Sequence, residues 1–287
     1  MLLLGILALA FGVGLAMAAL LASLRFGFRL VVPLSFLPLV ITLTGILGVH
    51  KAPNLVLAPL VGLAAAYQIA RGKSYGHIIA GAALPGLVQG VFLMVAASQE
   101  PQLREELADQ VLGQFESLEL PTGVDADDLR LLLISLLRLE PAMEYMAGLL
   151  TAVLAYGLAV FAARRLAWTL PPAAPMREWR LWDRLIWVLI GGMGLKLIVG
   201  DGLVDDLAVN ALVVMVVLYA VQGFSLTRFY IWRMRIPRSL EFLFYAVLLF
   251  ASGISIWVLA GVGLLDTRFD WRRLATKENE HEEVEGK

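Results

Sequence analysis

The chain of 287 residues contains no cysteine and only three histidines. The absence of cysteine excludes disulfide bonds, thiolate metal sites and thiol catalysis, and the histidines are too scattered to form a metal site. Charged residues are also scarce, at 16 % of the chain against about 25 % in soluble domains. Because the formal charge is −1, the chain lacks the basic excess that nucleic-acid binding requires, and we expect no nucleic-acid partner.

Sequence motifs of catalysis are missing as well. Gly72, Lys73 and Ser74 match the end of a phosphate-binding loop, but Tyr67 stands where that motif requires its leading glycine. The chain contains neither H-E-x-x-H nor G-x-S-x-G. We therefore expect no enzyme activity and no cofactor.

Long hydrophobic segments dominate what is present. Hydrophobic residues make up 60 % of the chain, and the mean hydropathy is +0.79. A spanning helix needs about 20 apolar residues, so we predict an all-α, polytopic integral membrane bundle with about eight transmembrane segments. The predicted segments are 1–24, 30–49, 55–70, 75–97, 142–163, 185–199, 207–224 and 240–265. The third and sixth are short enough to be tilted little, broken or re-entrant.

Two polar stretches interrupt or follow this predicted membrane domain, which covers residues 1–273. Residues 98–140 contain ten acidic residues and three arginines. Helical spacing of apolar residues predicts an amphipathic helix over 103–118, and the leucine-rich run 129–139 is expected on the membrane surface or against the bundle. The tail 274–287 is acidic and predicted to be disordered.

The distribution of lysine and arginine predicts the orientation, because basic loops stay in the cytoplasm. With the acidic loop outside, alternate loops place thirteen basic residues inside. Eight crossings, however, also put Arg268, Arg272 and Arg273 outside. Either one segment does not cross, with the third and sixth as candidates, or the tail departs from the rule.

Five polar residues at membrane depth are the candidates for a substrate-binding site, since polar groups inside a membrane usually face the bundle interior. They are Gln89, Glu144, Lys196, Asn210 and Gln222. The competing interpretation is that these groups bind neighbouring helices, or reach the membrane surface as Glu144 and Lys196 can.

Small residues and tryptophans carry simpler interpretations. The G-x-x-x-G pair of Gly86 and Gly90 and the A-x-x-x-A pair of Ala18 and Ala22 let helices approach closely, which favours internal packing. Five tryptophans beside arginines at segment ends are predicted to anchor the helices at the lipid headgroups. These are Trp179, Trp182, Trp187, Trp232 and Trp271.

The final third of the chain has a distinctive order of motifs. Trp179-Arg180-Leu181-Trp182 precedes the sixth segment, and the last helix ends in G-L-L-D-T-R-F-D-W-R from Gly263 to Arg272. With these motifs the chain resembles the YybS-like family of predicted bacterial membrane proteins, which is distantly similar to the S components of energy-coupling-factor transporters. The resemblance implies a multi-pass protein of the bacterial cytoplasmic membrane, with a small-molecule cavity and a docking surface at Ala18 and Ala22. About eight segments and an acidic loop depart from the six-helix S component.

Two functions remain open. The first is a small-molecule binding or transport subunit that uses the five polar residues. The second is a non-transporting membrane scaffold that binds another envelope protein through the 98–140 loop. Membrane lipids are expected partners in both.

Overall fold

A computed structural model of the chain describes residues 2–27, 29, 31–32, 54–99, 105–106, 108–109, 112–113, 126–171 and 175–272. All regular structure in these residues is helical, which confirms the predicted all-α class for them. The elements are α1 (Leu2–Phe26), α4 (Asn54–Ala70), α5 (Tyr75–Ala82), α6 (Leu84–Gln99), α8 (Ala126–Arg138), α9 (Glu140–Arg165), the short 3-10 helices η2 (Met176–Glu178) and η3 (Asp183–Leu185), α10 (Ile186–Ile198), α11 (Leu203–Arg233), α12 (Arg238–Phe250) and α13 (Ser252–Phe269).

Three helical stretches are long and apolar enough to cross a membrane. They are Tyr75–Val95, which joins α5 to most of α6, Glu140–Arg165 and Leu203–Arg233. The bent pair α12–α13 passes the same test only as one unit, either a broken span or a re-entrant loop, and Ala10–Phe26 and Leu57–Ala70 are shorter apolar helices. The predicted segment 185–199 corresponds to α10, which has 13 residues, and 30–49 lies almost wholly outside the described residues. The described part therefore contains three helices, or up to four if the bent pair is one span, that are long and apolar enough to cross a membrane, and eight crossings are not shown.

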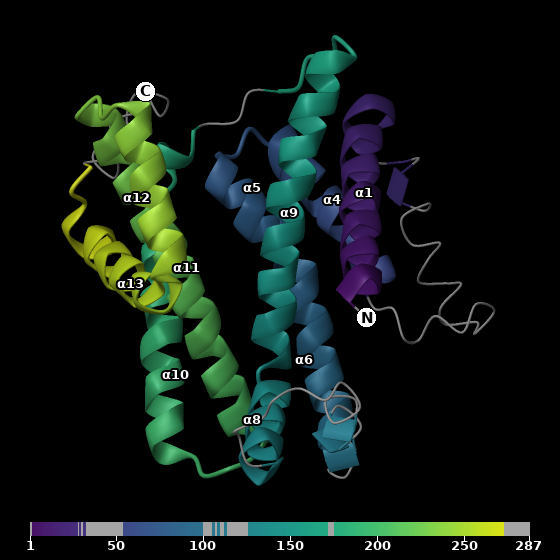
Figure 1. Ribbon diagram of the computed structural model, residues 1–287, viewed down its shortest axis with the longest axis vertical. Coiled ribbons are helices and arrows are strands. Elements are labelled where there is room, and N and C mark those ends of the chain that lie inside the picture. The colour runs from purple at the N-terminus through teal and green to yellow at the C-terminus, as the bar shows by residue number, and fades with distance from the viewer. Residues whose placement is uncertain are drawn as a thin grey trace, which may run out of the picture.

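The helices form two groups that lie side by side along most of their length (Figure 1). In the first, α1 packs against α4 and α9, and α6 packs against α9. In the second, α11 is central and contacts both α10 and α13. The 31 residues of α11 make it the longest helix described, about 46 Å at 1.5 Å per residue.

The first group is held together by backbones in direct contact. A Cβ atom added to Gly62 of α4 would lie 2.1 Å from the carbonyl oxygen of Ala16 in α1. Cβ atoms added to Gly86 and Gly90 of α6 would lie 2.4 Å from the Glu144 carbonyl oxygen and from the Pro141 Cα of α9. The predicted G-x-x-x-G pair is thus used for internal packing, because no larger residue fits between these helices.

Trp179 packs between the two groups of helices, and one prediction about it was wrong. Its side chain is only 1 % exposed, so it is a core residue and not the interfacial anchor predicted from its neighbouring arginine. It packs on Gly76 at the start of α5, where an added Cβ would lie 2.0 Å from the indole ring. The same hydrophobic cluster includes Tyr145 of α9 and Tyr219 of α11. The other four tryptophans that were predicted to be anchors are exposed, in agreement with that prediction. They are Trp182, Trp187, Trp232 and Trp271.

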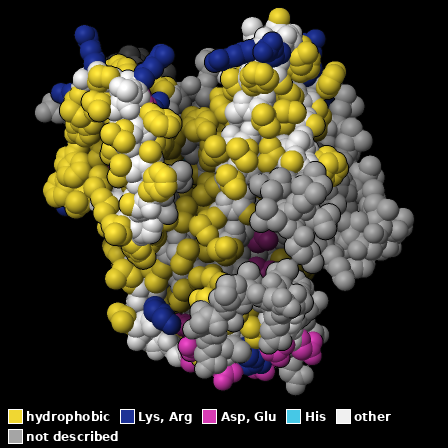
Figure 2. Space-filling view, in the orientation of Figure 1, with side chains coloured by type: hydrophobic (Ala, Val, Ile, Leu, Met, Phe, Trp, Pro, Cys, Tyr) yellow, Lys and Arg dark blue, Asp and Glu magenta, His cyan; other side chains and the backbone are white. Residues whose placement is uncertain are grey.

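Charge separates along the long axis of the molecule. Figure 2 shows most of the visible Lys and Arg side chains at its upper end, most of the Asp and Glu side chains at its lower end, and a hydrophobic belt between them. The basic end carries the C-terminus of α9, with Arg164 and Arg165 in its last turn, and the C-terminus of α11. The acidic end carries the start of α8, with Asp127 and Asp128 in its first turn, and the start of α11. This separation agrees with the orientation predicted from the loops.

The last hydrophobic segment turns back on itself. The axes of α12 and α13 are bent by 109° at the break between them. Four residues separate α12 from the end of α11, and Arg272, just past α13, donates a hydrogen bond to the Ser225 hydroxyl of α11. Ser225 lies about 12 Å below the C-terminal end of α11. Both ends of the α12–α13 pair therefore lie toward the basic end, and Arg268 and Arg272 lie there with the other basic residues.

Candidate functional site

The five residues predicted to bind substrate are distributed over three separate places. Gln89 and Glu144 lie on the packed pair α6 and α9, and Lys196 lies near the C-terminus of α10. Asn210 and Gln222 are both on α11, but twelve residues, or about 18 Å, apart. The structure therefore does not bring the five into one site.

Asn210 joins four elements at the acidic end. Its Oδ1 accepts a hydrogen bond from the Ala142 N–H at 2.9 Å. Its Nδ2 donates to the carbonyl oxygens of Arg138 at 2.7 Å and Asp206 at 2.8 Å, and lies 3.8 Å from the sulfur of Met94. Because the amide is buried and its hydrogen-bonding capacity is occupied, Asn210 holds α6, α8, α9 and α11 together and has no group left for a ligand.

Lys196 belongs to an ion-pair cluster at the same end. Its ammonium donates to both carboxylate oxygens of Asp205, at 2.7 and 2.8 Å. The neighbouring Asp206 lies 3.9 Å from the guanidinium of Arg138. Both aspartates are buried in the first turn of α11, where the helix dipole also favours a negative charge. Each carboxylate is thus balanced by a cation from another element.

Gln222 is part of a fully buried network in the second group. Its Oε1 accepts from the Leu181 N–H at 2.9 Å, and its Nε2 donates to Asp266 at 2.6 Å. Asp266 also accepts from Arg272 at 2.7 Å, and both side chains of this ion pair are at most 2 % exposed. The closing motif of the chain thus has a structural function, because its Asp266 and Arg272 fasten the end of α13 to α11.

The same network positions the loop between α9 and α10. Arg272 donates to the Arg177 carbonyl oxygen at 2.8 Å, and the Ser225 hydroxyl donates to the Met176 carbonyl oxygen at 2.6 Å. Gly263 lets the helices meet, since a Cβ there would lie 2.0 Å from the Tyr219 carbonyl oxygen. The loop carrying Met176 and Arg177 is therefore held against α11 by part-buried hydrogen bonds.

Gln89 and Glu144 differ from the other three predicted residues. Gln89 Nε2 and Glu144 Oε2 are buried, and neither has a hydrogen-bond partner among the described residues. They flank the contact of Gly86 and Gly90 with α9. Of the predicted residues, these two retain unused polar atoms.

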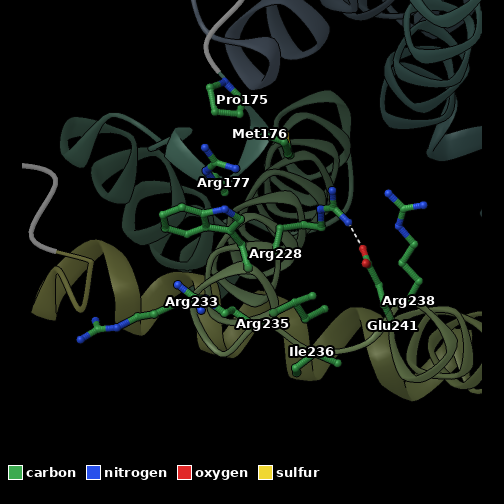
Figure 3. Close-up of a pocket in the computed structure, with 11 residues that line it drawn as sticks. Pro175, Met176, Arg177, Arg228, Arg233, Arg235, Ile236, Arg238 and Glu241 are labelled. Carbon is green, nitrogen blue, oxygen red and sulfur yellow. Dashed lines mark hydrogen bonds and ion pairs between the residues drawn. The ribbon is translucent and has the colours of Figure 1, made fainter.

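The basic end contains a pocket of 650 Å³ (Figure 3). It is formed by the loop before η2, the end of α11, the turn that follows and the start of α12. Five arginines, one glutamate and five apolar residues line it. They are Arg177, Arg228, Arg233, Arg235, Arg238, Glu241, Pro175, Met176, Ile231, Trp232 and Ile236.

A tight turn places three of these arginines. The Met234 and Ile236 N–H groups donate to the Tyr230 and Ile231 carbonyl oxygens, which ends α11 after Arg233. Arg235 adopts a left-handed backbone with φ of 53°, and Pro237 then caps α12. The turn therefore reverses the chain within four residues and brings Arg233, Arg235 and Arg238 around one opening.

Among the described residues, carboxylates compensate only part of the positive charge of the pocket. Arg228 donates hydrogen bonds to Glu241 and to the Tyr245 hydroxyl, so its charge is paired. Arg177 lies over the Trp232 ring, 4.3 Å from its centre, and 3.6 Å from Glu178. Figure 3 shows Arg228 directed at Glu241 across the pocket, with Arg238 beside Glu241.

Within the described residues, the guanidinium groups of the other three arginines form neither an ion pair nor a hydrogen bond. These are Arg233, Arg235 and Arg238. A pocket with several unpaired guanidinium groups is suited to phosphate or carboxylate.

From the sequence, these arginines are used to predict the orientation in the membrane and, where they neighbour tryptophans, the helix anchors. The signal that could have found the pocket is the density of arginine between Arg228 and Arg238, across a predicted helix end and a proline. Arg177, about 50 positions earlier, could not have been assigned to it, since the fold alone brings that loop to α11.

The acidic end presents a different surface. The Arg130 guanidinium of α8 donates to Asp109 at 2.7 Å and lies 3.6 Å from Glu105. This hydrogen bond holds the pKa of the Asp109 carboxyl below its ordinary value of 3.8. Leu131, Leu132 and Leu136 of α8 are exposed, as expected for a helix on the membrane surface or in contact with a partner.

Apolar helices of spanning length, with acidic and basic residues gathered at opposite ends, define a helical membrane protein. The chain matches a family model described as "Predicted membrane protein (DUF2232)" over residues 1–267, and it belongs to that family. Neither the search of curated proteins nor the search of solved structures gives a match.

Proposed function

We propose that the protein is a non-catalytic, membrane-embedded binding subunit whose ligand is an anion held by the arginine-lined pocket. The observation that carries this proposal is the grouping of five guanidinium groups and one carboxylate around a single 650 Å³ pocket. Three of the arginines have no counter-ion in the part of the chain that the structure describes. Bringing like charges together is unfavourable, and a bound anion would remove that cost.

The orientation predicted from basic loops would place this pocket at the cytoplasmic face of a bacterial inner membrane, in a multi-pass protein. A binding or transport subunit of the kind implied by the S-component resemblance would expose such a site to a soluble ligand or to the inner leaflet. The part-buried hydrogen bonds from Arg272 and Ser225 to the Arg177 loop support a preformed pocket, since the loop is held whether or not a ligand is present.

The test is anion binding by the purified protein in a neutral detergent. The probes are inorganic phosphate, glycerol 3-phosphate and phosphatidic acid, with glycerol and phosphatidylcholine as uncharged or zwitterionic counterparts. At least one anionic probe should bind, and the double variant R233A/R235A should weaken that binding by about tenfold or more.

The matched control is the double variant R164A/R165A. These two arginines are exposed at the same end of the molecule but do not line the pocket. Equal losses in both double variants would mean that binding follows the charge of the whole basic end, and the proposed site would be rejected.

A solute contact at Gln89 and Glu144 is a second candidate, favoured by their two buried atoms without partners in the described residues. A neutral polar solute beside the contact of α6 with α9 could use both groups. If Q89L and E144Q leave the uptake of every tested solute unchanged, this candidate loses its support.

The scaffold function is favoured by the exposed leucines of α8 at the acidic end. The triple variant L131S/L132S/L136S should then release a partner that co-purifies with the wild-type protein. A partner retained by this variant would count against α8 as the binding surface.

A further inference from the structure

We infer that the anion bound by the pocket is the phosphate headgroup of a membrane lipid, whose acyl chains lie along the exposed face of α12. This inference rests on the proposed function and specifies its ligand class. It is carried by the position of the pocket, by the mixed chemistry of its wall and by the surface that continues from it into the membrane.

The pocket lies where a spanning helix ends. Its wall includes the last turns of α11, the helix with the greatest length and a high apolar content. Trp232 in this wall is exposed and stacked with Arg177, a pairing typical of the headgroup region, where aromatic rings and cations meet lipid phosphates. A headgroup phosphate at this depth would come within reach of the unpaired arginines.

The wall is not uniformly polar, since Met176, Ile231 and Ile236 line it together with the arginines. A fully hydrated anion such as free phosphate gains nothing from apolar neighbours. An amphiphile gains from both parts, because its phosphate meets guanidinium groups and its glycerol and first methylenes meet apolar side chains.

α12 extends this apolar surface away from the pocket. The helix begins in the pocket wall with Arg238 and Glu241. Phe242 and Phe250 follow Arg238 at i+4 and i+12 on one ridge of the helix and are exposed, as is Val247 on the side away from Glu241. The Phe250 side chain is 91 % exposed. An exposed apolar ridge therefore leads from Arg238 to the far end of α12.

The length of α12 matches one leaflet. Its 13 residues measure about 20 Å, and half of the hydrocarbon core is about 15 Å thick. The chain then bends by 109° between α12 and α13, and the end of α13 lies toward the basic end. A helix of this length beside the basic pocket gives an acyl chain in that leaflet an apolar surface that is as long as the acyl chain.

The experiment separates headgroup from tail by native mass spectrometry of the full-length protein in a neutral detergent. Three probes are titrated: dioleoyl phosphatidic acid, glycerol 3-phosphate, which has the same phosphate without tails, and dioleoyl phosphatidylcholine, which has the same tails without net charge. Phosphatidic acid should bind at least about tenfold more tightly than either of the other two. R233A/R235A should abolish this preference, and R164A/R165A should preserve it.

Two further variants distinguish a specific effect on lipid binding from a loss of binding caused by misfolding. Among the described residues that line the pocket, Glu241 is the only carboxylate. E241Q should strengthen phosphatidic acid binding by about fivefold, because it frees Arg228 and removes a charge of the same sign as the phosphate; a gain of affinity cannot arise from unfolding. V247S/F250S, on the exposed face of α12, should weaken phosphatidic acid binding and leave glycerol 3-phosphate binding unchanged.

The outcomes distinguish this inference from the proposed function. If glycerol 3-phosphate binds as tightly as phosphatidic acid in a pocket-dependent way, the lipid inference is wrong and the anion site stands. If no anionic probe binds, both are wrong. A loss of affinity in E241Q would also overturn the lipid inference, because the headgroup would then not meet the freed arginine.

Discussion

At its N-terminal end, α11 presents two buried aspartates, and each of them lies beside a cation supplied by another element, Lys196 or Arg138. At its C-terminal end, α11 and the turn after it present four arginines, of which only Arg228 has a carboxylate partner among the described residues. The two ends of one helix thus differ in charge balance. A balanced cluster stabilises a helix contact, whereas an unbalanced one at the surface costs little when hydrated and remains available to an anion.

The buried ion pair below the pocket should show the largest effect. R272M leaves Asp266 buried without its cation, and we expect the free energy of unfolding in detergent to fall by about 3–5 kcal/mol. The double variant D266L/R272M should recover a large share of this loss, because it removes both buried charges. R268M, at an exposed position on the same helix end, is the control, and an equal effect there would contradict the network's role.

Asn210 tests the acidic end alone. N210L leaves the Ala142 N–H and the carbonyl oxygens of Arg138 and Asp206 without their partner, which should lower the free energy of unfolding by about 2–4 kcal/mol. Because the pocket lies at the other end of α11, phosphatidic acid binding by the folded variant should not change. Weaker binding in N210L would show that the two ends are coupled.

Lys196 and Arg235 compare a paired cation with an unpaired one. K196A deprives the nearly buried Asp205 of its partner, and we expect a loss of about 1–2 kcal/mol, reduced because the Lys196 side chain is 47 % exposed. R235A removes no ion pair in the described part and should change stability by less than about 0.5 kcal/mol while weakening anion binding. The reverse ranking in thermal unfolding would contradict the difference between the ends.

The smallest effect concerns the acidic loop. Hydrogen bonding to Arg130 lowers the pKa of Asp109, so the stabilisation from this pair is fully present above the ordinary pKa of 3.8 and is lost as the pH falls through the lower, folded value. Hydrogen exchange in α8 should therefore accelerate below about pH 4 in the wild type. D109N should remove that part of the pH dependence, and an unchanged profile would show that the pair does not hold the loop to α8.

Sequence reasoning predicted local features well. The leucine-rich run 129–139 was expected on the membrane surface or against the bundle, and it forms most of α8, whose Leu131, Leu132 and Leu136 are exposed. The Gly86–Gly90 pattern predicted a close helix contact, and α9 lies against it. These predictions succeeded because hydrophobic periodicity and residue size act within one helix or on its immediate neighbour.

The same reasoning could not identify which polar residues share a site. Asn210 and Gln222 both stand out as polar groups in an apolar segment, yet each is hydrogen-bonded to a different part of the chain. Trp179 was expected at the headgroups because of its neighbouring arginine, but a glycine 103 positions earlier, Gly76, makes room for it in the core. Such partners are far apart in sequence and carry no local signal.

Composition and periodicity alone established an all-helical membrane protein with charge sorted to its two ends, because transfer of apolar and charged groups between water and hydrocarbon depends on each segment separately. Only the packing of the chain determined that the last segment doubles back, that Arg272 closes on Asp266, and that Arg177 meets the arginines of the α11–α12 turn. These arrangements depend on contacts between remote residues, whose free energies exist only once the helices are assembled.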